Sequence, residues 1–205
     1  HRGQAVRDAL ASKHGVQVDQ VTVGCGSVGL LQQAFMAYVD VGDEVVYPWR
    51  SFEVHTVFSA IAEAEAVTVH LKGNSFDLEA VAAAVTNHTK LVILSTPNNP
   101  TGTVCSTKDL KQLLESVHDD VVVIIDEAYL EFVTDESVDN AVTELLPHHN
   151  NAVIFRTFSK AYGLAGLRVG YLLGHEGFCT QIQKVKDSYN VNRICLLYTS
   201  PSPRD

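Results

Sequence analysis

The sequence predicts an α/β fold in which a mostly parallel, doubly wound sheet is flanked by helices. Short runs rich in β-branched residues alternate with segments of helical pattern along most of the chain. Most of these runs are apolar at every position, above all Val121–Ile125 ahead of Asp126, and such runs indicate strands buried on both faces of a parallel sheet. Strands and helices in alternation are typical of parallel sheets covered by helices.

The pattern sets the bounds expected for each element. Strands are expected at Val21–Val23, Glu44–Tyr47, Ala66–Leu71, Lys90–Ser95, Val121–Asp126, Ala152–Arg156 and Val169–Leu173. Helices are expected at Gln4–His14, Ser27–Val39, Phe52–Glu63, Leu78–Val85, Lys108–Val117 and Glu176–Tyr189. Gly15 can end the first of these helices, and Asp77 and Thr107 can cap the amino ends of two others.

Composition and charge narrow the class of protein. Of the 205 residues, 46% are hydrophobic and 19% are charged, so the chain can build a core; this excludes a disordered tail, a coiled coil and a collagen-like repeat. Lys and Arg total 15 against 24 Asp and Glu, a formal net charge of −9, and such a surface repels nucleic-acid phosphates. We therefore expect a small-molecule ligand and no nucleic-acid partner.

The sequence also argues against a membrane span and a metal site. No apolar stretch approaches the roughly 20 residues that a bilayer crossing needs, and the amino-terminal segment lacks the apolar core of a signal peptide. The four cysteines form no Cys-x-x-Cys pair and do not cluster with histidines at zinc spacing, so neither a disulfide framework nor a metal is expected. A cytoplasmic protein fits these features best.

Residues 1–194 are expected to form one ligand-binding domain. The alternation of strands and helices stops near Leu196, and the last residues carry two of the six prolines. We interpret residues 195–205 as a foreign or unstructured tail. Because the chain also lacks an initiator methionine, it is interpreted as a fragment of a longer protein.

Four clusters of polar residues follow predicted strands, at the sheet edge where open parallel sheets bind ligands. The first is the glycine-rich loop Gly24–Gly29, which leads into the second predicted helix. Glycines allow close backbone approach, and the free N–H groups of a helix start attract an anion such as a phosphate. A tight turn without any ligand would also use these glycines.

The same loop reads Gly-x-Gly-x-x-Gly, which is the fingerprint of dinucleotide-binding dehydrogenases. That fingerprint also requires an acidic residue at the far end of the following strand, where it binds the ribose. Asp43 and Glu44 lie at the near end of their strand instead. A dehydrogenase domain is therefore the weaker interpretation of this loop.

The other three clusters carry side chains of distinct chemistry. Asn99 lies in a rigid turn where its amide can donate to a ligand oxygen, although turn chemistry alone also explains it. Asp126 ends the most apolar strand and needs a cation, which could be a metal, an arginine or a protonated ring nitrogen. Tyr129 is close enough to reach the same ligand. Lys160 lies among small and apolar residues, which suits a partly desolvated amine that reacts with a carbonyl.

Together the clusters require a ligand with a phosphate, a basic nitrogen, a hydrogen-bonding oxygen and a carbonyl, and pyridoxal phosphate has all four. The blocks Asn99–Gly102, Asp126–Tyr129 and Ser159–Arg168, in this order, resemble fold-type I pyridoxal-phosphate aminotransferases of the class I/II group. Within that group the chain is most similar to the histidinol-phosphate aminotransferase family. The resemblance runs from about Arg7 to Asn192 and covers the large, cofactor-binding domain.

The resemblance implies a role for each site residue. Lys160 would bond covalently to the cofactor and carry a proton to and from the substrate α-carbon. Asp126 would pair with the ring nitrogen, so that the ring acts as an electron sink. Further side chains would bind the ring oxygen (Asn99 and Tyr129) or stack on the ring (Phe52). The phosphate would be held by Gly26, Ser27, Thr157, Ser159 and Arg168.

The resemblance also implies an aminotransferase with a ping-pong mechanism. Histidinol-phosphate transamination in histidine biosynthesis, with glutamate and 2-oxoglutarate as the other couple, is the favoured reaction. An aromatic amino-acid aminotransferase is the nearest alternative, and a non-catalytic pyridoxal-phosphate sensor is a third. The family forms homodimers and has an amino-terminal arm and a small carboxyl-terminal domain that this sequence lacks. We therefore expect the 205 residues alone to be poorly active.

Overall fold

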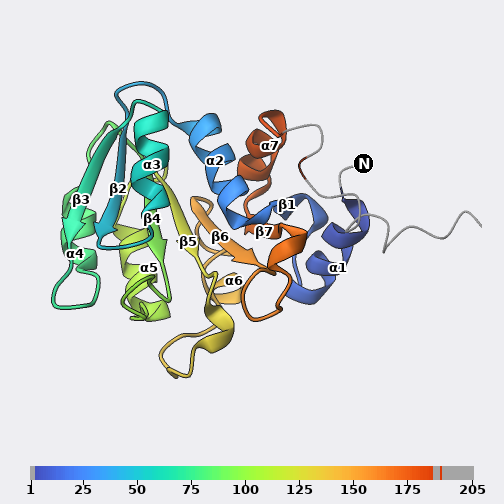
Figure 1. The fold of residues 1–205 in the computed structure, drawn as a ribbon. Coiled ribbons are helices and arrows are strands. Elements are labelled where there is room, and N and C mark those ends of the chain that lie inside the picture. Colours follow the sequence, from blue (N-terminus) through green and yellow to red (C-terminus); the bar gives the residue numbers. More distant parts are fainter. Residues whose placement is uncertain (1–2, 187–189, 191–205) are drawn as a thin grey trace, which may run out of the picture.

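The described residues, 3–186 and 190, form a seven-stranded sheet with helices on both faces (Figure 1), as seen in a computed structural model. The strands lie in the order β1-β7-β6-β5-β4-β2-β3. Their bounds are β1 (Val21–Cys25), β2 (Glu44–Trp49), β3 (Glu65–His70), β4 (Thr89–Ser95), β5 (Val122–Asp126), β6 (Ala152–Thr157) and β7 (Val169–Gly174). The predicted α/β class is confirmed.

Strand direction brings several strand ends to one edge of the sheet. β2 to β6 are parallel, whereas β7 pairs antiparallel with both β6 and β1. β1 therefore points the same way as β6, and the loop that follows β1 lies at the same edge as the carboxyl ends of β4, β5 and β6. The amino end of β7 also lies at this edge.

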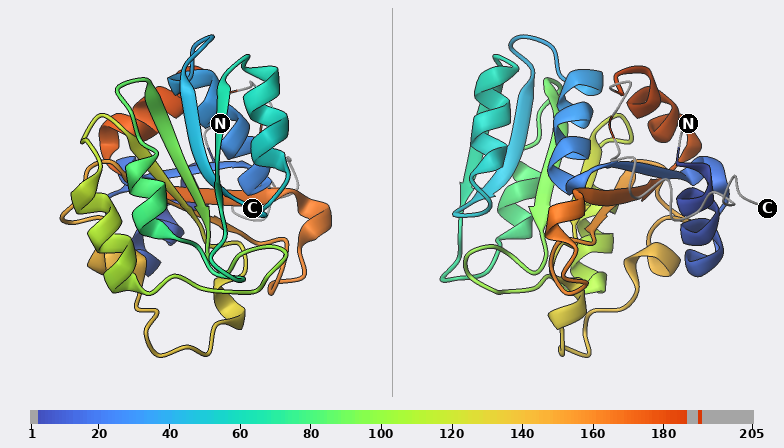
Figure 2. Two further views of the ribbon diagram at one scale, coloured as in Figure 1. Left: turned by 90° about the vertical axis from the view of Figure 1, so that its left-hand side faces the viewer. Right: turned by 45° about the vertical axis from the view of Figure 1, so that its right-hand side comes forward.

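Helices cover both faces of the sheet (Figure 2). One face carries α2 (Gly26–Tyr38), α3 (Val54–Ile61) and α7 (Glu176–Lys184), and the other carries α1 (Gln4–His14), α4 (Leu78–Ala83), α5 (Thr107–Ser116) and α6 (Ala141–Glu144). In β4, Leu91 and Ile93 belong to the core beneath α2, α3 and α7, while Val92 and Leu94 belong to the opposite core. Burial on both faces explains why the strands are apolar at successive positions.

Most element bounds agree with the prediction to within one or two residues. The helix predicted at Gln4–His14 is observed without change and ends at Gly15, whose φ of 68° is left-handed. β2 continues through Pro48 to Trp49, although we expected it to end at Tyr47. Pro48 lies beyond the part of β2 that pairs with β4, and proline is tolerated where one side of a strand has no ladder partner.

Several predicted helix ends are wrong. The third predicted helix begins at Val54 and not at Phe52, so Phe52 stays in the preceding loop. The cap of α5 is Ser106, whose Oγ accepts from the Asp109 N–H at 3.1 Å, and not Thr107. α7 ends at Lys184, whereas we expected it to continue to Tyr189. Residues 187–189 of that predicted helix lie outside the described residues. The predicted tail at 195–205 also lies outside them. Several short elements were not predicted, because their sequences show no repeating pattern of hydrophobic residues. They are α6 and the 3-10 turns Val18–Gln20, Leu130–Phe132 and Ala165–Leu167.

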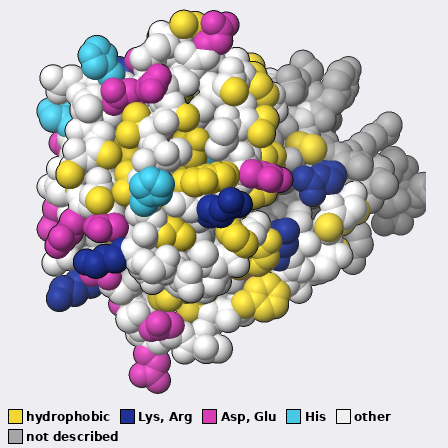
Figure 3. All heavy atoms as spheres, turned by 60° about the vertical axis from the view of Figure 1, so that its left-hand side comes forward, with side chains coloured by type: hydrophobic (Ala, Val, Ile, Leu, Met, Phe, Trp, Pro, Cys, Tyr) yellow, Lys and Arg dark blue, Asp and Glu magenta, His cyan; other side chains and the backbone are white. Residues whose placement is uncertain are grey.

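Part of the surface is apolar. On the face shown in Figure 3, hydrophobic side chains gather in the middle and several acidic side chains lie along the edge. Large exposed apolar side chains include Met36 on α2 and Val57 and Ile61 on α3. Such side chains are common where proteins contact one another, but the homodimer implied by the resemblance stays a prediction. Within the described chain, none of the helices has the length and apolar composition that a membrane span requires.

Candidate active site

A cavity of about 120 Å³ lies at the carboxyl ends of β4, β5 and β6. The last residues of these strands, Ser95, Asp126 and Thr157, all line it. Nine of the ten predicted site residues line this one cavity, namely Ser27, Phe52, Asn99, Asp126, Tyr129, Thr157, Ser159, Lys160 and Arg168. Segments that are far apart in the sequence therefore meet at a single place on the sheet edge.

Gly26, the tenth predicted residue, joins the start of α2 to Arg168. Its φ of +70° lies in the left-handed region that favours glycine. Its N–H donates to the Arg168 carbonyl oxygen at 3.1 Å, and a Cβ at this position would lie 2.7 Å from Arg168 Nη2. Gly26 therefore lets the arginine lie against the first turn of α2, where free N–H groups and the helix dipole favour an anion.

A second close approach, between β7 and the start of α2, depends on Gly170. A Cβ at Gly170 would lie 2.3 Å from the Ser27 nitrogen and 2.4 Å from the Gly26 carbonyl carbon, so no side chain fits there. Sequence reasoning missed this residue. A glycine inside a predicted strand is the signal that could have found it, because it often marks a close backbone approach.

Arg168 and two hydroxyl-bearing residues complete the donor cluster around the start of α2. Arg168 Nη1 donates to Ser159 Oγ at 3.3 Å, and the Ser159 N–H donates to Thr157 Oγ1 at 3.1 Å. Arg168 has a φ of +54°, which is uncommon outside glycine and is found most often at constrained sites. The cluster offers N–H, hydroxyl and guanidinium donors to one anion, as phosphate binding requires.

Asp126 is a buried carboxylate on the wall of the same cavity. Its Oδ1 accepts a hydrogen bond from the Ala128 N–H at 3.1 Å. Burial raises the pKa of Asp126 from 3.8 to about 6, and the neighbouring Glu127 adds to the rise, while the Ala128 hydrogen bond and the Lys160 cation oppose it. A buried carboxylate of this kind is stabilised by any cation placed against it.

Lys160 reaches the cavity beside Tyr129, with its Nζ 5.0 Å from the centre of the tyrosine ring. The expectation that apolar neighbours partly desolvate this amine is wrong, because Lys160 is exposed in the described chain. The residues after it form a surface turn that leads into the 3-10 turn Ala165–Leu167. Tyr162 and Leu164 in this turn are themselves 41% and 42% exposed.

Asn99 and Phe52 reach the cavity from two loops that are joined to each other. Asn98, next to Asn99, donates through Nδ2 to the Arg50 carbonyl oxygen at 3.1 Å and to Thr101 Oγ1 at 2.8 Å. The first bond connects the asparagine turn to the segment that carries Phe52. Phe52 lies in the loop just before α3, and it lines the cavity.

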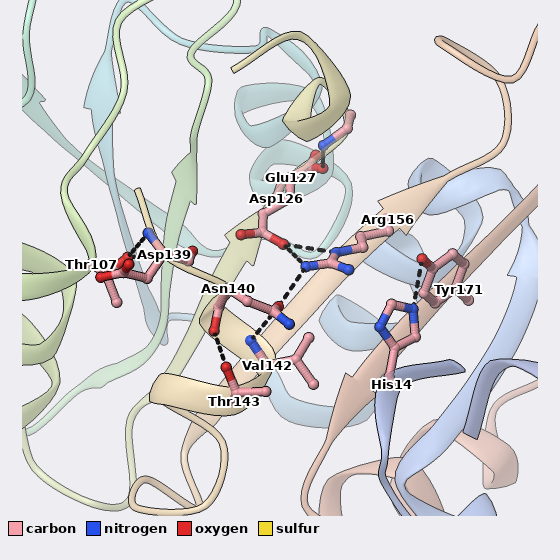
Figure 4. Close-up of polar contacts among 11 residues, drawn as sticks. His14, Thr107, Asp126, Glu127, Asp139, Asn140, Val142, Thr143, Arg156 and Tyr171 are labelled. Carbon is pink, nitrogen blue, oxygen red and sulfur yellow. Dashed lines mark hydrogen bonds and ion pairs between the residues drawn. The ribbon is translucent and has the colours of Figure 1, made fainter. Parts of the chain in front are cut away.

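A buried ion pair joins the strand ends beside the cavity (Figure 4). Arg156 Nε and Nη2 each lie 2.8 Å from Glu127 Oε2, and Nη2 also donates to Asn140 Oδ1 at 3.3 Å. Glu127 follows Asp126 at the end of β5, and Arg156 precedes Thr157 at the end of β6. The pair therefore connects two strands immediately next to two residues of the cavity wall.

Tyr171 and His14 lie on the other side of Arg156 (Figure 4). His14 Nε2 is 3.1 Å from the Tyr171 hydroxyl oxygen. Burial, together with the Arg156 cation and to a smaller extent Lys13, lowers the pKa of His14 to about 4. His14 is therefore neutral near pH 7, which avoids a second positive charge beside the arginine.

The cavity wall also contains residues to which the sequence analysis assigned no role in the site: Val28, Ser95, Pro97 and Ala128. Three of them adjoin predicted motif residues in the chain or belong to the asparagine turn. Ser95 is different, because it is the final residue of a buried strand, 4% exposed. Its position at the carboxyl end of a strand was the available signal.

Sequence comparison identifies the family that has this arrangement. The profile of the family "Aminotransferase class I and II" matches residues 2–200. The chain belongs to the class I and II aminotransferases. This assignment, together with the antiparallel edge at β1, replaces the dinucleotide-binding interpretation of the glycine loop.

Curated relatives of this class I and II family member are named aromatic amino acid aminotransferases. The protein from Corynebacterium glutamicum (strain R) is 46% identical over 188 residues, 91% of this chain and 55% of the relative. The protein from Thermobifida fusca (strain YX) is 45% identical over 186 residues, 91% of this chain and 52% of the relative. The chain thus spans about half the length of the curated relatives it matches.

Solved aminotransferase structures share the fold. The histidinol-phosphate aminotransferase of Sinorhizobium meliloti, in complex with pyridoxal-5'-phosphate, superposes with a TM-score of 0.88 at 29% identity, over 96% of this chain and 54% of its own. A methionine aminotransferase of Escherichia coli gives a TM-score of 0.85 at 29% identity, over 95% and 55% of the two chains. The seven-stranded sheet is therefore that of the large domain of these aminotransferases.

Proposed function

We propose that the chain is part of a pyridoxal-phosphate-dependent aminotransferase. The observation that carries the proposal is that Lys160 and Asp126 line one cavity, so that an amine and a carboxylate can act on the same flat ring. Two groups on opposite faces of the sheet could not share a cofactor. The Sinorhizobium meliloti neighbour, solved with pyridoxal-5'-phosphate, supports the choice of cofactor.

The residues of the cavity fit this cofactor. The donor cluster of Ser27, Ser159 and Arg168 at the start of α2 suits its phosphate. The buried Asp126 carboxylate suits a protonated ring nitrogen, because it gains from a cation. The accessible Lys160 amine suits its aldehyde.

Each residue has a separate task in the proposed reaction. The cofactor supplies, when bound, an electron-withdrawing ring that stabilises negative charge on the substrate α-carbon. Asp126 keeps a proton on the ring nitrogen, and Lys160 removes and returns the proton at the α-carbon. Tyr129 and Asn99 bind the ring oxygen. Phe52 packs against the ring and excludes water from it.

We infer that the substrates are aromatic amino acids. The curated relatives with this name are 45–46% identical to the chain, whereas the histidinol-phosphate aminotransferase of Sinorhizobium meliloti is 29% identical. The sequence motifs alone favoured histidinol phosphate over aromatic amino acids. The difference in identity reverses that order, and histidinol phosphate becomes the second candidate.

Half-reactions test the proposal and the substrate together. The whole protein that contains this chain is loaded with pyridoxal phosphate and mixed with phenylalanine, tyrosine or histidinol phosphate without an acceptor, and the oxo product is quantified by mass spectrometry. We expect the aromatic oxo acids to form faster, in amounts limited by the number of sites, and 2-oxoglutarate to restart the reaction with formation of glutamate. Faster conversion of histidinol phosphate would reverse the substrate assignment. No oxo product with any donor would contradict the aminotransferase proposal.

We also infer from the family resemblance that the whole protein is a homodimer, and from the cysteine pattern and the lack of long apolar stretches in the sequence that it is cytoplasmic. The exposed apolar side chains of α2 and α3, Met36, Val57 and Ile61, support an extensive protein contact. Analytical ultracentrifugation of the whole protein is expected to give twice the mass of its monomer. A monomer at all concentrations would contradict the dimer.

A further inference from the structure

Ser95 has a hydroxyl group that the described residues leave without a partner. Its Oγ is buried and forms no hydrogen bond with any of them, although the residue lines the cavity. Buried hydroxyl groups are nearly always hydrogen-bonded. A hydroxyl left unpaired on a cavity wall remains free to donate to a neighbouring group when a ligand fills the cavity.

The register of the sheet places Ser95 beside Asp126. The two residues are Cα partners in the parallel pair β4–β5, and each is the last residue of its strand. Neighbouring strands are about 4.8 Å apart, and side chains in register point to the same face of the sheet. Both residues line the cavity. The serine hydroxyl and the aspartate carboxylate are therefore neighbours on one wall.

The Asp126 carboxylate has room for a second donor. Its Oδ1 accepts from the Ala128 N–H, and Oδ2 accepts no hydrogen bond from the described part of the chain. A carboxylate that is ionised in a buried site is stabilised by each donor that reaches it. The Ser95 hydroxyl can turn about its own side-chain bond, so it can donate without any change in the backbone.

We propose that Ser95 is a positioning residue of the cofactor site, whose hydroxyl donates to the Asp126 carboxylate when that carboxylate pairs with the ring nitrogen. The inference rests on the proposed function, because it presumes the cofactor. Ser95 acts through Asp126: it fixes the orientation of the carboxylate and favours its ionised form. Nothing in the predicted site had assigned a role to this residue.

The test compares two alanine substitutions that each remove a buried, unpaired hydroxyl. Ser51 is the matched control, because its Oγ is also buried without a partner in the described chain, but it does not line the cavity. The affinity for pyridoxal phosphate is measured by absorbance titration. Ser95→Ala is expected to weaken binding about tenfold, which is the loss of one hydrogen bond to a charged group. Ser51→Ala should leave the affinity unchanged, and Ser95→Thr should restore most of it.

A cofactor analogue locates the effect. The carbon analogue of pyridoxal phosphate that lacks the ring nitrogen cannot pair with Asp126, so Ser95→Ala should hardly alter its affinity. An equal loss with both cofactors would overturn the inference, because Ser95 would then act elsewhere on the ligand or through packing. Equal affinities of Ser95→Ala and the parent for pyridoxal phosphate would also overturn it.

Two further measurements distinguish a failure of this inference from a failure of the proposed function and from misfolding of the variant. The melting temperature of the cofactor-free Ser95→Ala protein should not fall, since the substitution removes an unsatisfied polar group. A large fall would assign Ser95 a structural role and contradict the proposal. If the parent chain binds no pyridoxal phosphate at all, the proposed function fails, and this inference fails with it.

Discussion

Glu127 and Arg156 form a buried ion pair that holds the ends of β5 and β6 together beside the cavity. The Arg156 guanidinium places Nε and Nη2 2.8 Å from the same carboxylate oxygen, and both side chains are almost fully buried. Burial raises the pKa of Glu127, and the nearby Arg156 cation opposes that rise. The pair thus keeps two charges in the protein interior, each dependent on the other.

Breaking this pair should be costly. Arg156→Met leaves Glu127 buried without its cation, and the expected loss of unfolding free energy is about 3–5 kcal/mol. The double variant Glu127→Leu with Arg156→Met leaves no unpaired charge, so it should lose much less than the sum of the two single variants. Urea unfolding of the four proteins measures the coupling. If the loss of unfolding free energy in the double variant equals the sum of the losses in the two single variants, the two side chains do not stabilise each other.

Gly170 should be essential for binding an anion at the start of α2. In Gly170→Ala the new methyl group meets the backbone of Gly26 and Ser27, so β7 and α2 must move apart and the donor cluster must open. We expect pyridoxal phosphate affinity to fall more than tenfold, the effect of losing charge-assisted hydrogen bonds. Gly166→Ala is the matched control, because apart from its two chain neighbours no residue has a heavy atom within 4 Å of its Cβ position. Equal affinities of the two variants would contradict the close approach.

Asp126→Asn should make the cofactor-free chain more stable at neutral pH. Because burial raises the pKa of Asp126 from 3.8 to about 6, the folded chain keeps a proton in this range that the unfolded chain has released. Its contribution to stability is present below pH 3.8 and is lost as the pH rises through 6. The advantage of Asp126→Asn should therefore grow between pH 4 and pH 7, to about 3 kcal/mol at most.

Asp135→Asn is the control for this pH dependence. Asp135 is fully exposed, and the Ser137 hydroxyl and N–H groups lower its pKa, so this substitution should give no gain at pH 7. Unfolding free energies of the parent and both variants are compared across the pH range. A constant difference between Asp126→Asn and the parent would mean that Asp126 titrates as it does in the unfolded chain.

The sequence allowed most of the fold and most of the cavity wall to be predicted. Val121–Ile125 identified a central strand because burial on both faces leaves a continuous apolar run. Asp126 was found because a carboxylate is unusual at the end of a buried strand, and Lys160 because it follows a strand and lies among small and apolar residues in the sequence. Chain order alone thus located these residues, since the carboxyl ends of parallel strands meet at one edge.

Other features depend on contacts between distant segments. Gly170 matters because a strand passes within contact distance of a helix start about 140 residues earlier in the chain, which no local pattern encodes. The sequence analysis placed Arg156 at the end of a strand and did not predict its ion pair. Its partner Glu127 lies 29 positions earlier in the chain, so no local pattern connects the two residues. The exposure of Lys160 was mispredicted because apolar neighbours in sequence need not cover a side chain in a surface turn. These are tertiary effects that override local composition.

The attachment point of the cofactor tests the central claim most directly. The chain is incubated with pyridoxal phosphate, reduced with borohydride, digested and analysed by mass spectrometry, with Lys160→Ala and Lys111→Ala treated in parallel. Lys111 is an exposed lysine on α5, away from the cavity wall. The account predicts one stoichiometric adduct on Lys160 that Lys160→Ala abolishes and Lys111→Ala retains. An adduct that survives Lys160→Ala at full yield, or no adduct in the parent chain, would contradict it.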